Sequence, residues 1–294
     1  MSAQHRAFAP LDYLQLLVIA LIWGVNNIAS KIAVDVFPPM MLAAMRFGMV
    51  LVMLAPWLRW PKTTDIRFFI GMLLFTGPLH FSILFTALRM AREVSPMVVA
   101  MQLWAPASVV FAAIILKERA GPLRWIGVGL AFLGAAALNF DASVFAQAGP
   151  LAVAGFASCL YGLGATFMRR VGPMSALGTQ AWIALATAPT LGLASLLFEH
   201  GQRQAIATAP WPAWAALVLA GLGSSVLASA MLFNLVQRYE VSRTTPYLLT
   251  TPIISFICAS LFLGETITLQ EMLATACVMS GVALVALAER RTAV

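Results

Sequence analysis

The stretch EVSPMVVAMQLWAPASVVFAAIILKERAGP, residues 93–122, decides the fold of this chain because its pattern occurs twice. It is an apolar segment of membrane-spanning length, with a proline near its middle and charged residues at its end. Its residues match others 147 positions later without a gap: Glu93 with Glu240, Glu118 with Glu265 and, just beyond the stretch, Gly134 with Gly281. Pro106 and Pro252 miss this register by one position, but each lies near the middle of an apolar run. A constant spacing between matching residues indicates an internal repeat.

The composition places the chain in a lipid bilayer. Hydrophobic residues make up 61% of the 294 residues and charged residues 10%, and the mean hydropathy is +0.90. One water-soluble core could not bury so much apolar surface. Apolar runs of about 20 residues alternate with short polar breaks, as in transmembrane helices, without the two-residue alternation of barrel strands. We expect an all-α polytopic membrane protein.

Ten transmembrane helices are expected, at residues 13–34, 38–58, 68–88, 96–116, 123–140, 149–168, 174–198, 211–236, 245–263 and 269–287. With the N-terminus in the cytoplasm, thirteen Lys and Arg residues lie inside and only three outside, which favours both termini on the cytoplasmic side. Five spans per repeat is an odd number, so the two repeats, residues 1–146 and 147–294, have opposite orientations. Inverted repeats are typical of transporters whose substrate site lies at the membrane midplane between the halves.

The sequence holds few groups for catalysis or cofactor binding. It has no phosphate-binding loop, no nucleophile elbow, no zinc-binding helix motif and no paired intramembrane carboxylates. Its three cysteines fall inside predicted spans without metal or disulfide spacing, so they are interpreted as packing residues. The net charge of +7 comes mainly from short loops, where cations set membrane orientation. We expect no enzyme, no cofactor, no metal and no nucleic-acid partner.

Proton coupling has one candidate residue. All acidic residues lie at or beyond the ends of the predicted spans, so no carboxylate relay is expected deep in the membrane. His80, beside Pro78, is the only intramembrane side chain that ordinarily titrates near neutral pH. It is interpreted either as a proton carrier or, more simply, as a hydrogen-bonded packing residue.

The first span carries polar residues that are costly in hydrocarbon unless they face other helices or a cavity. Trp23 and Asn27 are four residues apart and therefore share a helix face. Asn26 and Asn27 either hold helices together or contact a substrate, and both interpretations stay open.

Two cations also lie within spans, both toward the outer side of the membrane by helix rise. Lys31 either snorkels to the interface or meets a substrate, and we favour neither interpretation. Arg46 either pairs with Asp35, Glu265 or helix-end carbonyls, or receives a substrate carboxylate. We favour a fixed partner for Arg46, because buried arginines normally have one.

Two helical stripes indicate a substrate pocket around the central prolines. The stripes are Met97, Met101, Trp104 and Ser108 in the fourth span, and Thr244, Tyr247 or Leu248, Thr251 and Ser255 in the ninth. Helix packing alone would explain such stripes, but Pro106 and Pro252 free backbone carbonyls that persist only beside protein or water. With Tyr161 and Trp182, the stripes predict an aromatic, Met-rich pocket for apolar or aromatic small molecules.

These motifs together resemble a known family. The first span reads IWGVNNIASK at residues 22–31, the second contains AAMRF with Arg46, and the two proline-containing spans close on KE at Glu118 and GE at Glu265. Over essentially its whole length the chain resembles the drug/metabolite transporter superfamily, and within it the ten-helix EamA-type exporters, most like the bacterial aromatic amino acid exporters. The resemblance implies two inverted five-helix repeats around a central cavity, and export of small metabolites across a bacterial inner membrane.

The resemblance also implies positions for the substrate site. Matching the cavity-facing helices of the family places five residues near substrate: Asn27, His80, Trp104, Tyr161 and Tyr247. The second repeat departs from the first, because it has Tyr161-Gly162 where the first has Trp23-Gly24 and Arg169 where the first has Lys31. A symmetric site is therefore not implied.

The predicted function is facilitative export of amino acids, with aromatic and large apolar ones favoured, by alternating access. The alternatives are export of drugs or other small metabolites, with or without proton coupling, and a membrane scaffold or receptor component without flux. Predicted substrate contacts are Trp23, Asn27, His80, Met101, Trp104, Tyr161, Trp182, Tyr247 and Thr251. Predicted conformational or charge-pairing residues are Lys31, Arg46, Pro106, Pro252, Glu118 and Glu265. We expect a monomer or homodimer in the bacterial inner membrane, with the substrate and the lipid bilayer as partners.

Overall fold

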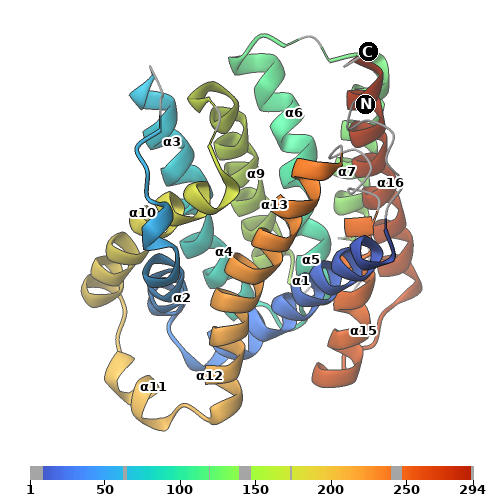
Figure 1. The fold of residues 1–294 in the computed structure, drawn as a ribbon. Coiled ribbons are helices and arrows are strands. Elements are labelled where there is room, and N and C mark those ends of the chain that lie inside the picture. The colour runs from blue at the N-terminus through green and yellow to red at the C-terminus, as the bar shows by residue number, and fades with distance from the viewer. Residues whose placement is uncertain are drawn as a thin grey trace.

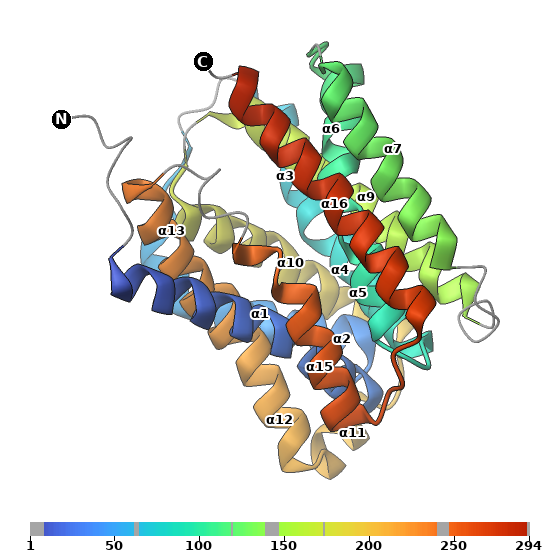
Figure 2. The ribbon, with the colours of Figure 1, turned by 90° about the vertical axis from the view of Figure 1, so that its right-hand side faces the viewer.

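The described part of the chain is a bundle of helices without strands. The computed structural model describes residues 9–61, 65–118, 120–138, 147–172, 174–239 and 247–292. Glu240 and Thr244, which the repeat register and the ninth-span stripe included, lie outside these residues. Figures 1 and 2 show the C-terminal end of α16 (Leu269–Thr292) at one end of the bundle and the short helix α11 (Gln202–Thr208) at the opposite end.

Every predicted span contains helix. The first five spans correspond to α1 (Pro10–Val36), α2 (Pro39–Leu54) with a 3₁₀ turn at Ala55–Trp57, α3 (Ile66–Thr76) with α4 (Pro78–Met90), α5 (Ser95–Met101) with α6 (Trp104–Ile115), and α7 (Pro122–Ala137). The last five correspond to α9 (Ala148–Val171), α10 (Ala176–Phe198), α12 (Trp211–Val218) with the π-helical segment η4 (Leu219–Ala228) and α13 (Ser229–Arg238), α15 (Thr251–Leu263), and α16 (Leu269–Thr292).

Their lengths suit a membrane. Among the described residues, eight helical segments are long and apolar enough to cross a bilayer, and α7 and α15 are shorter apolar helices of 16 and 13 residues. The prediction of an all-α polytopic membrane protein is confirmed. A bilayer core offers no water to the backbone, so each span satisfies its own polar groups by forming helix.

Glycine and proline divide several spans into half-helices. Gly77 separates α3 from α4 with a backbone of φ −110° and ψ −107°, outside the helical region. Pro106 is the third residue of α6, and a proline ring clashes with the carbonyl four residues earlier, so the helix breaks at Gln102. Pro252 is the second residue of α15. Pro106 therefore lies in the first turn of the second half-helix of its span, and Pro252 lies in the first turn of α15, where the sequence predicted a proline near the middle of each span.

Helices from the two halves of the chain interlock. Helix α1 packs against α15, α12 and η4, while α9 packs against α3, α4 and α6. Helix α2 lies along α10, and α7 lies along α16. Each half therefore contributes its first helix to the packing of the other, and the space between α1, α2, α4, α9 and η4 lies at the centre of the bundle.

Glycines bring α7 and α16 into close contact. A Cβ added at Gly281 would lie 2.5 Å from the carbonyl oxygen of Gly127 and 2.6 Å from the amide nitrogen of Ala131. A Cβ at Gly134 would lie 2.8 Å from the amide nitrogen of Val278. The backbones approach so closely that only hydrogen fits at these positions, as at small-residue contacts in membranes.

Candidate functional site

Two neighbouring cavities lie at the centre of the bundle and share Arg46 and Phe81. The Tyr161 cavity has a volume of about 180 Å³ and is also lined by Trp23, Thr76, Gln180 and Ser225, among others. The Asn26 cavity has a volume of about 170 Å³ and is also lined by Asn27, Ser30, His80, Leu84, Phe85 and Met101, among others. Together they reach the lower end of the range for small-molecule sites, about 300–1,000 Å³.

Arg46 of α2 reaches the boundary between these cavities as a buried cation. Its residue surface is 6% exposed, and its guanidinium carbon lies 5.3 Å from the ring centre of Phe81 and 5.6 Å from that of Phe47. Nη2 donates to Ser225 Oγ at 3.1 Å, whereas Nε is buried without a hydrogen-bond partner. No carboxylate of the described residues pairs with it, so neither Asp35 nor Glu265 is its fixed partner.

Lys31 of α1 has the fixed partners that Arg46 lacks. Its ammonium group donates to Asp35 Oδ1 at 2.7 Å, to the carbonyl of Leu88 at 3.1 Å and to that of Ala91 at 2.8 Å. These carbonyls end α4, where helix geometry leaves acceptors unsatisfied and a cation is stabilised by the helix dipole. The structure therefore shows Lys31 capping the end of α4, and Lys31 is not among the residues that line either cavity.

The two adjacent asparagines of α1 differ in their partners. Asn27 Nδ2 donates to Ser255 Oγ at 2.9 Å, and that hydroxyl in turn lies 3.1 Å from the carbonyl of Gly24, which links α1 to α15. Asn26 Oδ1 is buried without a hydrogen-bond partner and lines the Asn26 cavity. The sequence indicated that both side chains are costly to bury in hydrocarbon, but only Asn27 was predicted to contact substrate. Residue spacing does not show which of the two amides has hydrogen-bond partners.

His80 and Tyr161 form the aromatic wall of the site. His80 Nδ1 lies 2.8 Å from the carbonyl oxygen of Ala157, and because a carbonyl only accepts, this nitrogen carries a proton. The His80 ring lies 4.9 Å from that of Tyr161, which in turn contacts Trp104 at 5.7 Å between ring centres. The break at Gly77 places His80 in the first turn of α4, from which it reaches α9.

The structure brings most of the predicted contacts together. Trp23, Asn27, His80, Met101 and Tyr161 line the two cavities. Trp104 and Thr251 line neither cavity, although the Trp104 ring contacts that of Tyr161 and the carbonyl of Thr251 accepts from Ser255 Oγ at 3.1 Å.

Two predicted contacts lie elsewhere. Trp182 packs with Trp60 and Phe69, at 5.2 and 5.3 Å between ring centres, and lines neither cavity. Tyr247 is 38% exposed and contacts Tyr13 at 5.8 Å between ring centres. The pattern of side chains along one helix could not show which face of that helix the neighbouring helices would cover.

Glu265 caps a helix from the other half of the chain. Its carboxylate accepts from the amides of Val94 at 2.6 Å and Ser95 at 3.0 Å, and from Ser95 Oγ at 2.6 Å. Gly264, with a φ of 71°, ends α15 in the left-handed conformation that directs the chain toward the start of α5. This junction lies toward the end of the bundle opposite the C-terminal end of α16 (Figure 2).

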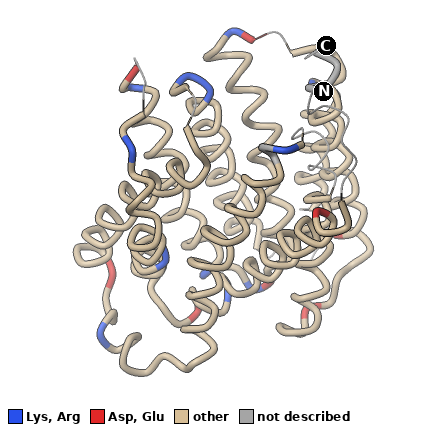
Figure 3. The backbone as a smooth tube through the Cα atoms, viewed as in Figure 1, with Lys and Arg blue, Asp and Glu red and all other residues tan. Residues whose placement is uncertain are grey.

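The matching residue Glu118 has a different partner. It forms an ion pair of 2.8 Å with Arg169, and both side chains are partly exposed. Figure 3 shows charged segments at this end of α6, on the same side of the bundle as the C-terminal end of α16. The two matched carboxylates therefore lie in unlike environments.

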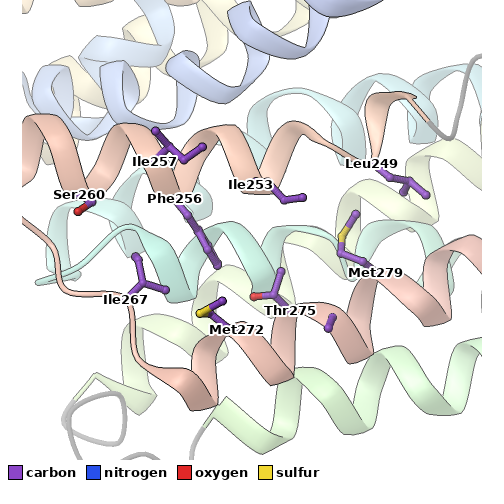
Figure 4. A pocket seen from close by; sticks show the side chains of 10 residues that line it. Leu249, Ile253, Phe256, Ile257, Ser260, Ile267, Met272, Thr275 and Met279 are labelled. Atoms are coloured by element: carbon purple, nitrogen blue, oxygen red, sulfur yellow. The ribbon is translucent and has the colours of Figure 1, made fainter.

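A third hollow, which is apolar, lies between α15 and α16. It has a volume of about 540 Å³, and Figure 4 shows Phe256 reaching from α15 toward Met272 and Thr275 of α16. Its lining residues include no charged group and none of the predicted site residues. Size alone does not make it the candidate site, because it offers little to orient a polar solute.

Comparisons with known proteins agree with this fold. A model of the EamA-like transporter family matches residues 11–140 and 149–287. Two relatives named "Probable amino-acid metabolite efflux pump", from Salmonella typhimurium and Escherichia coli, are 26% and 24% identical over 276 residues, covering 90% of this chain and 91% of each relative. An "Uncharacterized transporter YvbV" of Bacillus subtilis is 26% identical over 289 residues, covering 92% of this chain and 90% of that one. A solved crystal structure with 20% sequence identity matches 97% of this chain and 99% of its own with a TM-score of 0.63, which supports the fold alone.

Proposed function

Because the chain belongs to the EamA-like transporter family, we propose that it is a facilitative exporter of amino acids, with aromatic and large apolar ones favoured. Two relatives whose names refer to amino-acid metabolite efflux support the substrate class. We place the chain in a bacterial inner membrane with both termini cytoplasmic, and divide it into inverted repeats at residues 1–146 and 147–294. Substrate would bind in the two central cavities, where helices of both repeats meet.

One observation carries this proposal: Arg46 is a buried cation beside a cavity and has no carboxylate partner among the described residues. A charge inside the membrane is costly unless it is paired or hydrated. A guanidinium binds a carboxylate through parallel hydrogen bonds, and Nε is free to make one of them. The carboxylate of an amino acid supplies the partner that the protein lacks, and the rings of Phe81, Phe85 and Tyr161 suit an apolar side chain.

Alternating access would require the caps at the end opposite the C-terminal end of α16 to open. Besides the Glu265 cap, Glu199 accepts from the amides of Met40 at 2.8 Å and Met41 at 3.0 Å, which ties the end of α10 to the start of α2. We assign these junctions to closure of the outer gate. Breaking them would let the two repeats rock apart around the cavities and release substrate.

The test is counterflow of labelled phenylalanine, tryptophan and methionine in liposomes that contain only the purified protein. We expect flux by the wild type, at least a tenfold loss in the Arg46→Met variant because a hydrogen-bonded charge pair is removed, and a smaller loss in Arg46→Lys. The matched control is Arg67→Met, an exposed arginine at the start of α3, which should keep wild-type flux. Full flux in Arg46→Met would overturn the role of Arg46, and no flux in the wild type would favour a scaffold or receptor role.

Competition separates the remaining alternatives. Excess unlabelled aromatic amino acid should reduce the flux, whereas a drug or metabolite exporter would be inhibited by those compounds instead. An imposed pH gradient should leave the flux unchanged if transport is facilitative. Stimulation by the gradient would make His80 the first candidate for a coupling residue.

A further inference from the structure

Two residues that line the same small cavity each carry a buried polar atom without a hydrogen-bond partner. Arg46 Nε is a donor on α2, and Asn26 Oδ1 is an acceptor on α1; both residues line the Asn26 cavity. Buried polar atoms are nearly always hydrogen-bonded, and leaving one unpaired costs free energy. One unmatched donor and one unmatched acceptor in one cavity indicate a ligand that carries the complementary pair.

The rest of the cavity wall is largely apolar. Phe81, Leu84, Phe85 and Met101 line it alongside the polar residues. Such a site offers a ligand both polar groups and apolar surface. It suits a small molecule that joins an anionic acceptor, a cationic donor and an apolar group on a single centre.

We propose that Asn26 recognises the α-ammonium group of the substrate while Arg46 holds its carboxylate. The pair then selects zwitterionic amino acids over acids that lack the amine and amines that lack the acid. An ammonium group has three donors and no acceptor, so it needs an oxygen such as Asn26 Oδ1. This inference rests on the proposed function, because it names how that site distinguishes its substrate class.

Asn27, the next residue, provides a natural comparison. Its amide is already bound to the hydroxyl of Ser255, so its replacement disturbs the contact between α1 and α15. Asn27 is the same residue type as Asn26 and lies on the same helix, but its side-chain nitrogen already has a hydrogen-bond partner. Ser255 itself lines neither cavity, so removing its hydroxyl tests the packing of α1 on α15 apart from recognition.

The experiment uses three probes of similar size and apolar character. They are phenylalanine, 3-phenylpropionate without the amine, and phenethylamine without the carboxylate, each tested as a competitor of labelled phenylalanine in proteoliposomes. We expect the wild type to bind phenylalanine at least tenfold more tightly than either analogue. Asn26→Leu should weaken the binding of phenylalanine about tenfold or more and leave the binding of 3-phenylpropionate nearly unchanged, because only the amine loses its hydrogen-bond acceptor.

The controls keep the outcomes distinct. Ser255→Ala removes the hydroxyl that links α1 to α15, so it should lower the unfolding temperature and preserve the ratio between phenylalanine and 3-phenylpropionate. If Asn26→Leu does not fold, Asn26→Ala removes the same amide without added bulk and must show the same loss of discrimination. A wild type that transports phenylalanine while both Asn26 variants keep the ratio overturns this inference alone, whereas a wild type without phenylalanine flux overturns the proposed function.

Discussion

Replacing Glu265 by glutamine should open the end of the bundle that lies opposite the C-terminal end of α16. In the wild type this carboxylate is 9% exposed and accepts three hydrogen bonds, two from the amides of Val94 and Ser95 and one from Ser95 Oγ. The glutamine side chain keeps one oxygen that can accept a hydrogen bond, but an NH₂ group replaces the other oxygen and faces a hydrogen-bond donor of Val94 or Ser95. At least one charge-assisted hydrogen bond is therefore lost. Such a bond contributes about 1.5–3 kcal/mol. Each 1.4 kcal/mol is a factor of about ten in an equilibrium, so the open population should rise about ten- to a hundredfold.

Hydrogen exchange at the amides of Val94 and Ser95 measures this opening directly, because their bonds to Glu265 protect them. Their exchange rates should rise by the same factor in Glu265→Gln. Ser95→Ala, which removes one of the three bonds, should give a smaller increase. Glu118→Gln is the matched control at the other end, where the partner is Arg169, and should leave these two amides unchanged. Equal exchange in Glu265→Gln and the wild type would refute the capping argument.

Three further outcomes follow from the packing and the charges. Gly281→Leu should destabilise the protein by about 1–3 kcal/mol or more, measured as a lower unfolding temperature in detergent, because its Cβ would lie 2.5 Å from the carbonyl of Gly127. Lys31→Met should cost about 1–3 kcal/mol of stability by leaving two helix-end carbonyls and Asp35 without their cation, with little change in the KM for phenylalanine. His80→Gln should leave counterflow equally insensitive to a pH gradient as the wild type, and a gradient response that disappears in this variant would show proton coupling instead.

The helices could be predicted from the sequence because the bilayer acts on each span separately. A run of about 20 apolar residues must satisfy its own backbone, so composition and length identify a helix without knowledge of its neighbours. The interruption at Gly77 was less evident, although the Gly-Pro pair was its signal. Pro106 was recognised as a residue that interrupts a helix. Its place near the start of α6 follows from the clash between its ring and the carbonyl of Gln102, four residues earlier.

The site was only partly predictable for the opposite reason. Lys31 and Arg46 are both single cations in apolar spans, and sequence reasoning favoured a fixed partner for Arg46 while leaving Lys31 open. The structure gives the partners to Lys31, because the end of α4 lies beside it. Similarly, Trp182 and Tyr161 are both aromatic residues in apolar helices, and only the packing of α9 against α4 brings Tyr161 to the cavities.

By itself, the sequence determined that this chain is a helical membrane protein with an internal repeat. The length of each apolar run and the constant spacing between matching residues can both be read without knowing how the helices pack. The tertiary structure decided which polar atoms are satisfied and which remain free at Arg46 and Asn26. Hydrogen bonds extend only about 3 Å, and their partners here come from helices far apart in the chain, so satisfaction depends on packing rather than on spacing.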